Sequence, residues 1–231
     1  MRRALLVLVV LALLLVVADR GALYLAEREA ERRVEREAGG PTAVQLHGVP
    51  FLTQLAGQRL EHVELDGDRA RLRGEGADAR EVTVSDVHAD LYGVTRGPDG
   101  SARAGTLDAV GTIPLREAER LAGLPAGSVT SGPDGTLRVA RPIAVLGVNL
   151  DASATARVRV EGRELVFDPQ RVQVEGATLE LDQGARAQLA DRLRTRVQLP
   201  ALPEGSRVED VEVTDAGLRF RVTGEDVTLR G

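Results

Sequence analysis

Apolar and polar residues alternate along most of this chain, and the alternation limits the fold more than any other feature. Side chains of a β-strand point in turn to the two faces of a sheet, so a period of two indicates strands with one apolar face. From Leu60 onward the pattern recurs in short segments typical of antiparallel strands, with a slip at Ser85 and Asp86. The longest run predicts a strand, or a bent pair of strands, with apolar residues on one parity: Ala144, Leu146, Val148, Leu150, Ala152, Ala154, Ala156, Val158 and Val160.

The middle of this run is rich in alanine, and a sheet with such small side chains can curve closely around something thin. The thin object is either a helix of the protein itself or an acyl chain. Helical spacing of apolar residues occurs at 23–38, directly after Pro114, and at 182–197. The motif GPDG, at 97–100 and 132–135, is typical of turns between hairpin strands. We therefore predict an α+β fold in which curved antiparallel sheets wrap around amphipathic helices.

A weak internal echo relates two strand-like segments. GQRLEHVEL at 57–65 resembles GSRVEDVEV at 205–213, with a constant offset of 205 − 57 = 148. Two pseudo-repeats, each made of a helix, a plug and a pair of strands, would explain the echo. Chance similarity among strands rich in Arg, Glu and Val is the less favoured explanation.

The first 18 residues read MRRALLVLVVLALLLVVA, two arginines followed by an apolar run. The run of about 15 residues is shorter than the roughly 20 of a membrane-spanning helix, and Val16 and Ala18 suit a cleavage site before Asp19. A further apolar stretch at 21–26 would instead lengthen an anchor, so residues 1–18 are a signal peptide or a signal anchor. In both cases Arg2 and Arg3 favour export of everything that follows, to the extracytoplasmic side of the membrane.

Residues 19–40 predict an amphipathic helix with a narrow apolar stripe, ended by Gly39 and Gly40. Its polar face mixes Glu with Arg, which favours packing along a sheet over lying on a membrane surface, where a basic face is expected. Residues 41–231 then form the main α+β domain. About 190 residues are enough for one sizeable core.

The stretch Leu46–Gln58, LHGVPFLTQLAGQ, breaks the alternation because its apolar residues crowd together. Pro50 restricts the residue before it and cannot donate a backbone hydrogen bond. An extended approach that turns into a short helical or looped plug is expected. On the residues alone, the plug either closes one end of a sheet as core or contacts a ligand, and core is the more usual outcome.

The run VPFLTQ at 49–54, followed by a glycine and the strand LEHVELDGD, resembles the motif of the actinobacterial LmeA-like phospholipid-binding family. Members of that family usually read FPFLTQ, and Val49 replaces the first Phe. The resemblance covers nearly the whole chain. It implies a cell-envelope protein that holds a phospholipid in an apolar cavity, and a fold similar to tubular lipid-binding proteins of the bactericidal/permeability-increasing type.

Composition and motifs argue against several other functions. Cysteine is absent, which rules out disulfides, thiolate metal sites and a cysteine nucleophile. All 30 basic residues are Arg and the formal net charge is −5, a balance that argues against nucleic-acid partners. The sequence has no nucleophile elbow, phosphate-binding loop or dinucleotide fingerprint. We therefore predict no catalytic residue and no cofactor.

The candidate metal ligands are three histidines and one acidic cluster. His47, His62 and His88 lack the spacing of a zinc motif, and a hydrogen-bonded or solvated role is expected for each. The acidic residues of ELDGD at 64–68 would share one strand face and attract calcium, but a hairpin turn at DGD explains them more simply. No metal site is predicted.

Some residues are predicted to line a lipid slot because they are bulky and lie near the plug or the helix predicted at 182–197. These are Phe51, Leu52, Leu55, Phe167, Leu189, Leu193 and Phe220. For each of these, plain core is the more usual role than contact with a ligand. An arginine can bind a lipid phosphate through paired hydrogen bonds, and the candidates for that role are Arg141, Arg192 and Arg196.

Two functions remain open. In the first, the protein is a non-catalytic envelope protein that sequesters or presents a phospholipid, with about 0.8 kcal/mol gained for each buried methylene. Its partners are the phospholipid and, through an uncleaved N-terminal segment, the cell membrane. In the second, the core is fully packed and the charged exterior docks a partner such as an envelope-assembly enzyme. A cavity distinguishes the two, because a packed core leaves no room for lipid.

Overall fold

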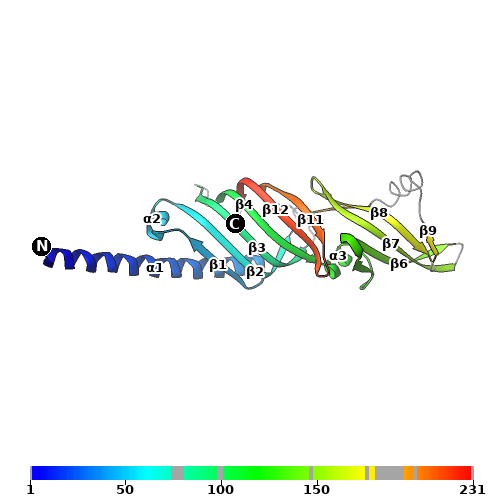
Figure 1. Ribbon diagram of the computed structural model, residues 1–231, viewed down its shortest axis with the longest axis horizontal. Helices are drawn as coiled ribbons and strands as arrows, with labels where there is room; N and C mark the ends of the chain where they lie inside the picture. The colour runs from blue at the N-terminus through cyan, green and yellow to red at the C-terminus, as the bar shows by residue number, and fades with distance from the viewer. Residues whose placement is uncertain are drawn as a thin grey trace.

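Two antiparallel sheets follow one another along the length of an elongated molecule, with one long helix beside the first sheet (Figure 1). The structure is a computed structural model, and it describes residues 2–73, 81–97, 101–145, 148–174, 177–179, 195–199 and 202–229.

The first sheet, here called sheet A, combines the N-terminal and the C-terminal strands of the chain. Its strand order is β1-β2-β3-β4-β12-β11. These strands are β1 (Thr42–His47), β2 (Arg59–Arg73), β3 (Glu81–Arg96), β4 (Ala102–Pro114), β12 (Gly217–Leu229) and β11 (Glu204–Val213).

The second sheet, sheet B, is built from the part of the chain between β4 and β11. Its order is β10-β8-β7-β6-β5, with β9 also paired to β8. The hairpin from β5 to β6 turns through a short 3-10 helix, Pro133–Gly135, at the second GPDG motif. The strands are β5 (Val129–Ser131), β6 (Thr136–Val145), β7 (Val148–Glu161), β8 (Glu164–Val174), β9 (Ala177–Leu179) and β10 (Thr195–Gln198).

Three α-helices accompany the sheets. Helix α1 (Arg2–Ala38) runs without a break through residues 18 and 19 and ends at Gly39, whose φ is +70°. Helix α2 (Phe51–Ala56) follows Pro50, and α3 (Leu115–Ala122) follows Pro114 and ends at the left-handed Gly123. Within the part of the chain that the structure describes in full, no helix is both long enough and apolar enough to cross a membrane.

The slip in the alternation at Ser85 and Asp86 is a β-bulge. The register between β3 and β4 shifts between Ser85 and His88, and Asp86 has a φ of +50°. One extra residue in a strand reverses the parity that faces the core. Apolar side chains therefore stay on one side of β3 throughout, and the buried ones on either side of the bulge are Val82, Val84, Ala89 and Leu91.

The core consists of two clusters. The larger one, here called the junction cluster, joins sheet A to sheet B, and its buried members are Val82, Val84, Ile113, Val129, Leu137, Leu165, Leu199, Val213, Leu218 and Phe220. The smaller one lies within sheet A and is formed by Ala89, Leu91, Ala104, Leu107 and Val227. The residues of both clusters are mostly aliphatic, as a chain with 2% aromatic residues requires.

The structure confirms the predicted α+β fold with antiparallel sheets and corrects three local predictions. DGD at 66–68 is not a hairpin turn, because it lies inside β2, which pairs with β1 on one side and β3 on the other. The alternating run at 144–160 is not one strand, because Val145 pairs with Val148 across a hairpin. Thr195–Val197 are not helical as predicted, because Thr195–Gln198 pair with β8 as a strand, and the rest of the helix predicted at 182–197 lies outside the described residues.

The internal echo does not relate one sheet to the other. Its first segment contributes to β2 and its second to β11, and both are strands of sheet A. β11 lies at the edge of that sheet, where its acidic residues discourage pairing with further strands.

Candidate lipid-binding site

The apolar surface at the junction of the sheets extends beyond the buried core. Val158, Val160 and Phe167 of sheet B pack against the junction cluster and stay partly exposed, as do Val208 and Val211 of sheet A. Burial of such surface by a ligand is favourable by about 25 cal/mol for each Å² removed from water. The two sheets together therefore offer an aliphatic surface against which an acyl chain can be buried.

An open cavity of about 880 Å³ adjoins this surface beside α3. Its volume lies within the range of roughly 300 to 1,000 Å³ that is usual for small-molecule sites. Leu115, Leu124 and Val129 belong both to the cavity wall and to the apolar packing around the junction cluster. The wall is completed by four further small residues and four charged ones, namely Pro114, Ala126, Gly127, Ala216, Arg116, Glu119, Arg120 and Asp215.

Two glutamates fix α3 above the junction. Glu119 is only 3% exposed, and its Oε1 accepts a hydrogen bond of 2.8 Å from the backbone N–H of Val129. Glu117 Oε1 accepts one of 2.9 Å from the backbone N–H of Thr83. The helix is thus bonded to β5 on one side and to β3 on the other, which gives the cavity a rigid wall.

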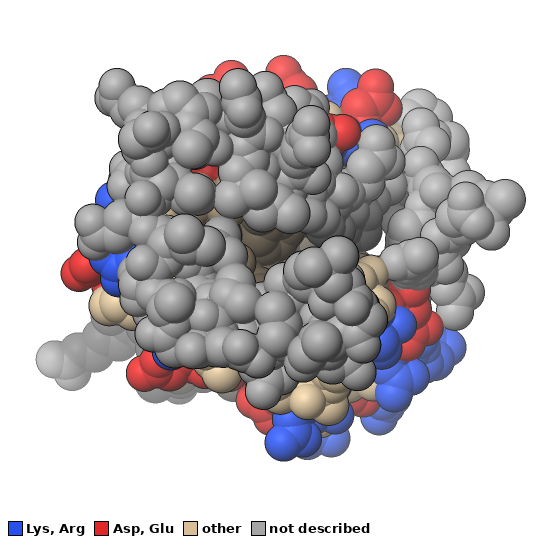
Figure 2. Space-filling model, turned by 90° about the vertical axis from the view of Figure 1, so that its right-hand side faces the viewer, with Lys and Arg blue, Asp and Glu red and all other residues tan. Residues whose placement is uncertain are grey.

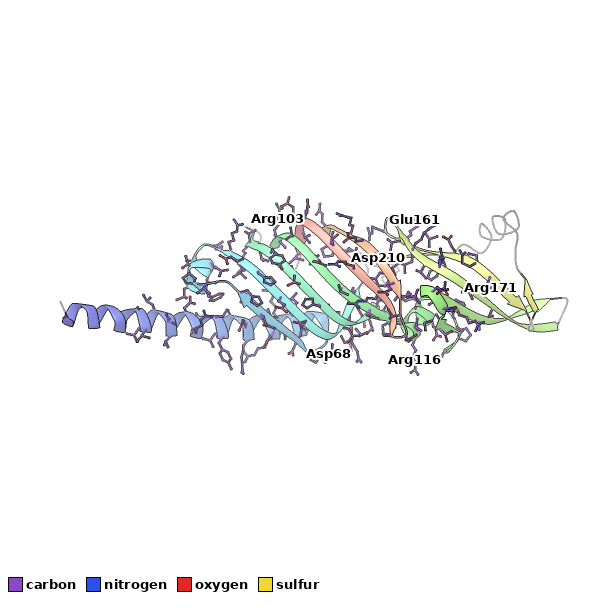
Figure 3. The ribbon with its side chains drawn as sticks, viewed as in Figure 1. Asp68, Arg103, Arg116, Glu161, Arg171 and Asp210 are labelled. Atoms are coloured by element: carbon purple, nitrogen blue, oxygen red, sulfur yellow. The ribbon has the colours of Figure 1, made fainter. Side chains whose placement is uncertain are left out.

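Arg116 and Arg120 are the cations of this cavity. Arg120 is already engaged, because its Nε donates to Glu117 Oε2 at 2.9 Å. That hydrogen bond holds the pKa of the Glu117 carboxyl below its ordinary value of 4.5, against a smaller opposing effect of partial burial. Arg116 is exposed and forms no ion pair with any residue inside the described ranges. It is the second residue of α3, and Figure 3 shows it where the two sheets meet.

The sheet B end of the molecule is hollowed. Figure 2 looks at this end along the long axis and shows uncharged described residues at the bottom of a central hollow. The described Arg, Asp and Glu side chains in this view lie mostly toward the periphery.

The predicted slot residues fall into two separate places. Phe220 is buried in the junction cluster, and Phe167 packs against it. Phe51, Leu52 and Leu55 lie on α2, at the end of sheet A from which α1 projects (Figure 1). The structure therefore brings together two of the predicted residues at the junction and places the other three elsewhere.

The plug itself is only partly buried. Phe51 is 2% exposed, as a core plug requires. By contrast, Val49, Leu52 and Leu55 are 69%, 36% and 54% exposed, so the expectation that the crowded apolar residues are all buried is wrong. The backbone of this segment follows the expected course, extended at Pro50 and helical from Phe51.

The remaining predicted residues cannot be assigned to the site from their side chains. Leu189, Leu193 and Arg192 lie outside the described residues. The backbones of Arg141 and Arg196 belong to β6 and β10. Sequence reasoning missed Arg116, and the signal that distinguishes it is its place in the first turn of a helix that starts after Pro114.

A polar ladder covers another face of sheet A and contains all three histidines. His47, His62 and Tyr92 are cross-strand neighbours on β1, β2 and β3, and their rings stack with centroids 4.5 Å and 4.4 Å apart. Each histidine is hydrogen-bonded to a carboxylate: His47 to Glu64 at 2.9 Å, His62 to Asp90 at 2.6 Å and His88 to Asp66 at 2.7 Å. The structure thus gives each histidine the hydrogen-bonded role expected for it.

His88 stands at the most acidic point of this ladder. The hydrogen bond to Asp66, together with the charges of Asp66 and Asp90, raises the pKa of His88 above its ordinary value of 6.5, although desolvation opposes the shift. An open cavity of about 670 Å³ lies beside it, and its other charged residues are Glu31, Glu35, Asp66, Asp68 and Asp86.

Three donors of the ladder lie close enough to be considered as metal ligands. Glu64, Asp66 and His88 each offer one ligand atom, and these atoms lie within 4.8 Å of one another. Each of the three side chains already takes part in a hydrogen bond between a histidine and a carboxylate. Cross-strand pairing therefore accounts for their arrangement.

The fold and the site together define an elongated, β-rich protein with an apolar surface and an open cavity where two antiparallel sheets meet. The chain belongs to the LmeA-like phospholipid-binding family, which it matches over residues 17–223 of 231. The match confirms the resemblance seen in the VPFLTQ motif. Comparison with curated proteins and with solved structures gives no match.

Proposed function

We propose that this chain is an exported, extracytoplasmic protein that binds one phospholipid at the junction of its two sheets. The acyl chains lie against the partly exposed aliphatic side chains of the junction, and the headgroup stays at the cavity beside α3. The function is sequestration or presentation of the lipid, and no bond is broken.

The observation that carries this proposal is the composition of the 880 Å³ cavity. Its apolar wall continues into the junction cluster, and its margin bears an arginine without an ion pair among the described residues. A phospholipid needs both features, an aliphatic surface for its chains and a donor for its phosphate. A guanidinium supplies that donor through paired hydrogen bonds.

The N-terminal segment supports placement outside the cytoplasm. Arg2 and Arg3 precede the apolar run, an arrangement that keeps them on the cytoplasmic side and sends the rest of the chain outward. Contacts between α1 and the body of the protein include the side chains of Asp19 and Glu27, both beyond the apolar run. Both residues follow the cleavage site expected before Asp19, so neither would be lost if the segment were removed.

Native mass spectrometry of the full chain tests the proposal. The protein is purified in a mild non-ionic detergent from a phospholipid-containing host, and any bound lipid is identified after organic extraction. We expect one phospholipid per chain. A chain that carries no lipid and takes up no fluorescent phospholipid from vesicles would contradict the proposal and leave a scaffold that docks an envelope enzyme.

A further inference from the structure

The plug carries an exposed apolar surface that the lipid site does not use. Val49, Leu52 and Leu55, here called the apolar tip, lie within seven consecutive residues and are 69%, 36% and 54% exposed. Phe51 between them is buried and anchors α2 to the body of the protein. Large apolar side chains that gather on a surface mark a site of interaction with a protein or a membrane.

The apolar tip is joined to the N-terminal apolar run by a specific contact. Asp19 Oδ1 accepts a hydrogen bond of 2.8 Å from the backbone N–H of Leu52, and Asp19 is only 6% exposed. Asp19 is also the first charged residue after the run that begins at Ala4. α2 is therefore held at the level of α1 where the sequence changes from apolar to charged.

The neighbouring surface of α1 is equally apolar. Residues 13–17 are large aliphatic side chains with exposures between 57% and 68%. Figure 1 shows α1 projecting past sheet A on the side where α2 lies. α2, which carries the apolar tip, and the apolar part of α1 thus lie at the same end of the molecule and are joined at Asp19.

We infer that the apolar tip docks on the surface of a phospholipid bilayer. A charged residue prefers the boundary between lipid and water while apolar residues beside it enter the lipid, and the exposed Arg20, directly after the apolar run, marks that depth beside α2. A bilayer fits better than a protein groove because α2 is joined to a helix whose exposed side chains are aliphatic on several successive positions.

Docking through the apolar tip fixes the orientation of the molecule. The α2 end of sheet A lies nearest the membrane, and sheet B extends away from it (Figure 1). The inference extends the proposed function, because it brings a phospholipid-binding protein to the surface that contains its ligand. Membrane docking and lipid binding can be disproved independently, since lipid bound in the cavity and contact with the bilayer are measured by different experiments.

The absence of cysteine makes a direct test straightforward. Leu55→Cys in the full chain is labelled with an environment-sensitive fluorophore and reconstituted into vesicles of phosphatidylcholine and phosphatidylglycerol. Leu72→Cys is the matched control, because Leu72 is 42% exposed and lies near the far end of β2 from α2. Phospholipids with a nitroxide near the headgroup end of the acyl chain report contact by quenching the fluorescence.

We expect the probe at position 55 to be quenched at least threefold more than the probe at position 72. Adding Leu52→Ser to the labelled protein should reduce that quenching at least twofold. Equal quenching at both positions would overturn the inference. A blue shift at position 55 that depends on protein concentration and not on the nitroxide lipid would assign the apolar tip to a protein partner instead. Native mass spectrometry of the same variants shows whether lipid binding persists.

Discussion

Arg116 is the residue on which the polar half of the proposed site depends. It lies in the first turn of α3 at the margin of the cavity, and the neighbouring Arg120 is occupied by Glu117. Hydrogen bonds to charged groups contribute about 1.5 to 3 kcal/mol, and exposure of Arg116 reduces that value.

Arg116→Gln should therefore weaken phospholipid binding by about 1 to 2 kcal/mol, a factor of roughly 5 to 30. The measurement is titration of the full chain with a fluorescent phospholipid. Arg103→Gln is the control, because Arg103 is an exposed arginine on β4 that does not line the cavity (Figure 3). Equal affinities of the two variants for the phospholipid would show that Arg116 does not contact it.

Glu119 has a structural role that can be separated from lipid binding. Its buried carboxylate is the acceptor for the backbone N–H of Val129, and without it that donor is left buried and unpaired. Glu119→Ala should lower the free energy of unfolding by about 1 to 3 kcal/mol. Glu119→Gln keeps a carbonyl acceptor, so its free energy of unfolding should fall by less. Urea unfolding of both variants measures the difference, and two equal losses would show that the hydrogen bond is unimportant.

At the scale of elements, the alternation in the sequence predicted most of the strands, and the slip that it shows at Ser85 and Asp86 proves to be the bulge in β3. It was insufficient where neighbours in space decide the outcome. DGD resembles a turn, yet β1 and β3 pair with both sides of it and keep it extended. Similarly, β12 inserts between β4 and β11, a long-range pairing that no local pattern encodes.

The ladder on β1, β2 and β3 predicts a pH effect of known sign. The pKa of His88 is raised in the folded protein, chiefly by its hydrogen bond to Asp66. Its contribution to stability is therefore fully present below the ordinary value of 6.5 and is lost as the pH rises through the higher folded value.

Nuclear magnetic resonance titration of the three histidines tests this effect. The midpoint of His88 should lie above 6.5 and fall in Asp66→Asn, where the carboxylate is gone. Asp68→Asn is the control, because Asp68 is an exposed neighbour on β2 that makes no hydrogen bond to His88 in the described structure (Figure 3). A midpoint that is the same in all three proteins would show that the ladder does not perturb His88.

At the scale of the whole molecule, the sequence predicted the family and the aliphatic core but did not indicate the cavity beside α3. Phe51 and Phe220 have the same bulk and burial, yet they lie at α2 and at the junction of the sheets. Every basic residue is Arg, so composition could not single out Arg116. Only the meeting of α3 with two sheets creates the cavity, and that meeting depends on contacts between distant parts of the chain.

Filling the cavity should therefore abolish lipid binding without unfolding the protein. Ala126 is exposed and lines the cavity, so the indole of Ala126→Trp would occupy space that the lipid needs. Ala122→Trp adds the same side chain at the exposed end of α3, outside the cavity wall. We expect at least tenfold less co-purified phospholipid with Ala126→Trp, and unchanged lipid with Ala122→Trp, at equal melting temperatures. Equal lipid content in the two variants would show that the lipid does not occupy this cavity.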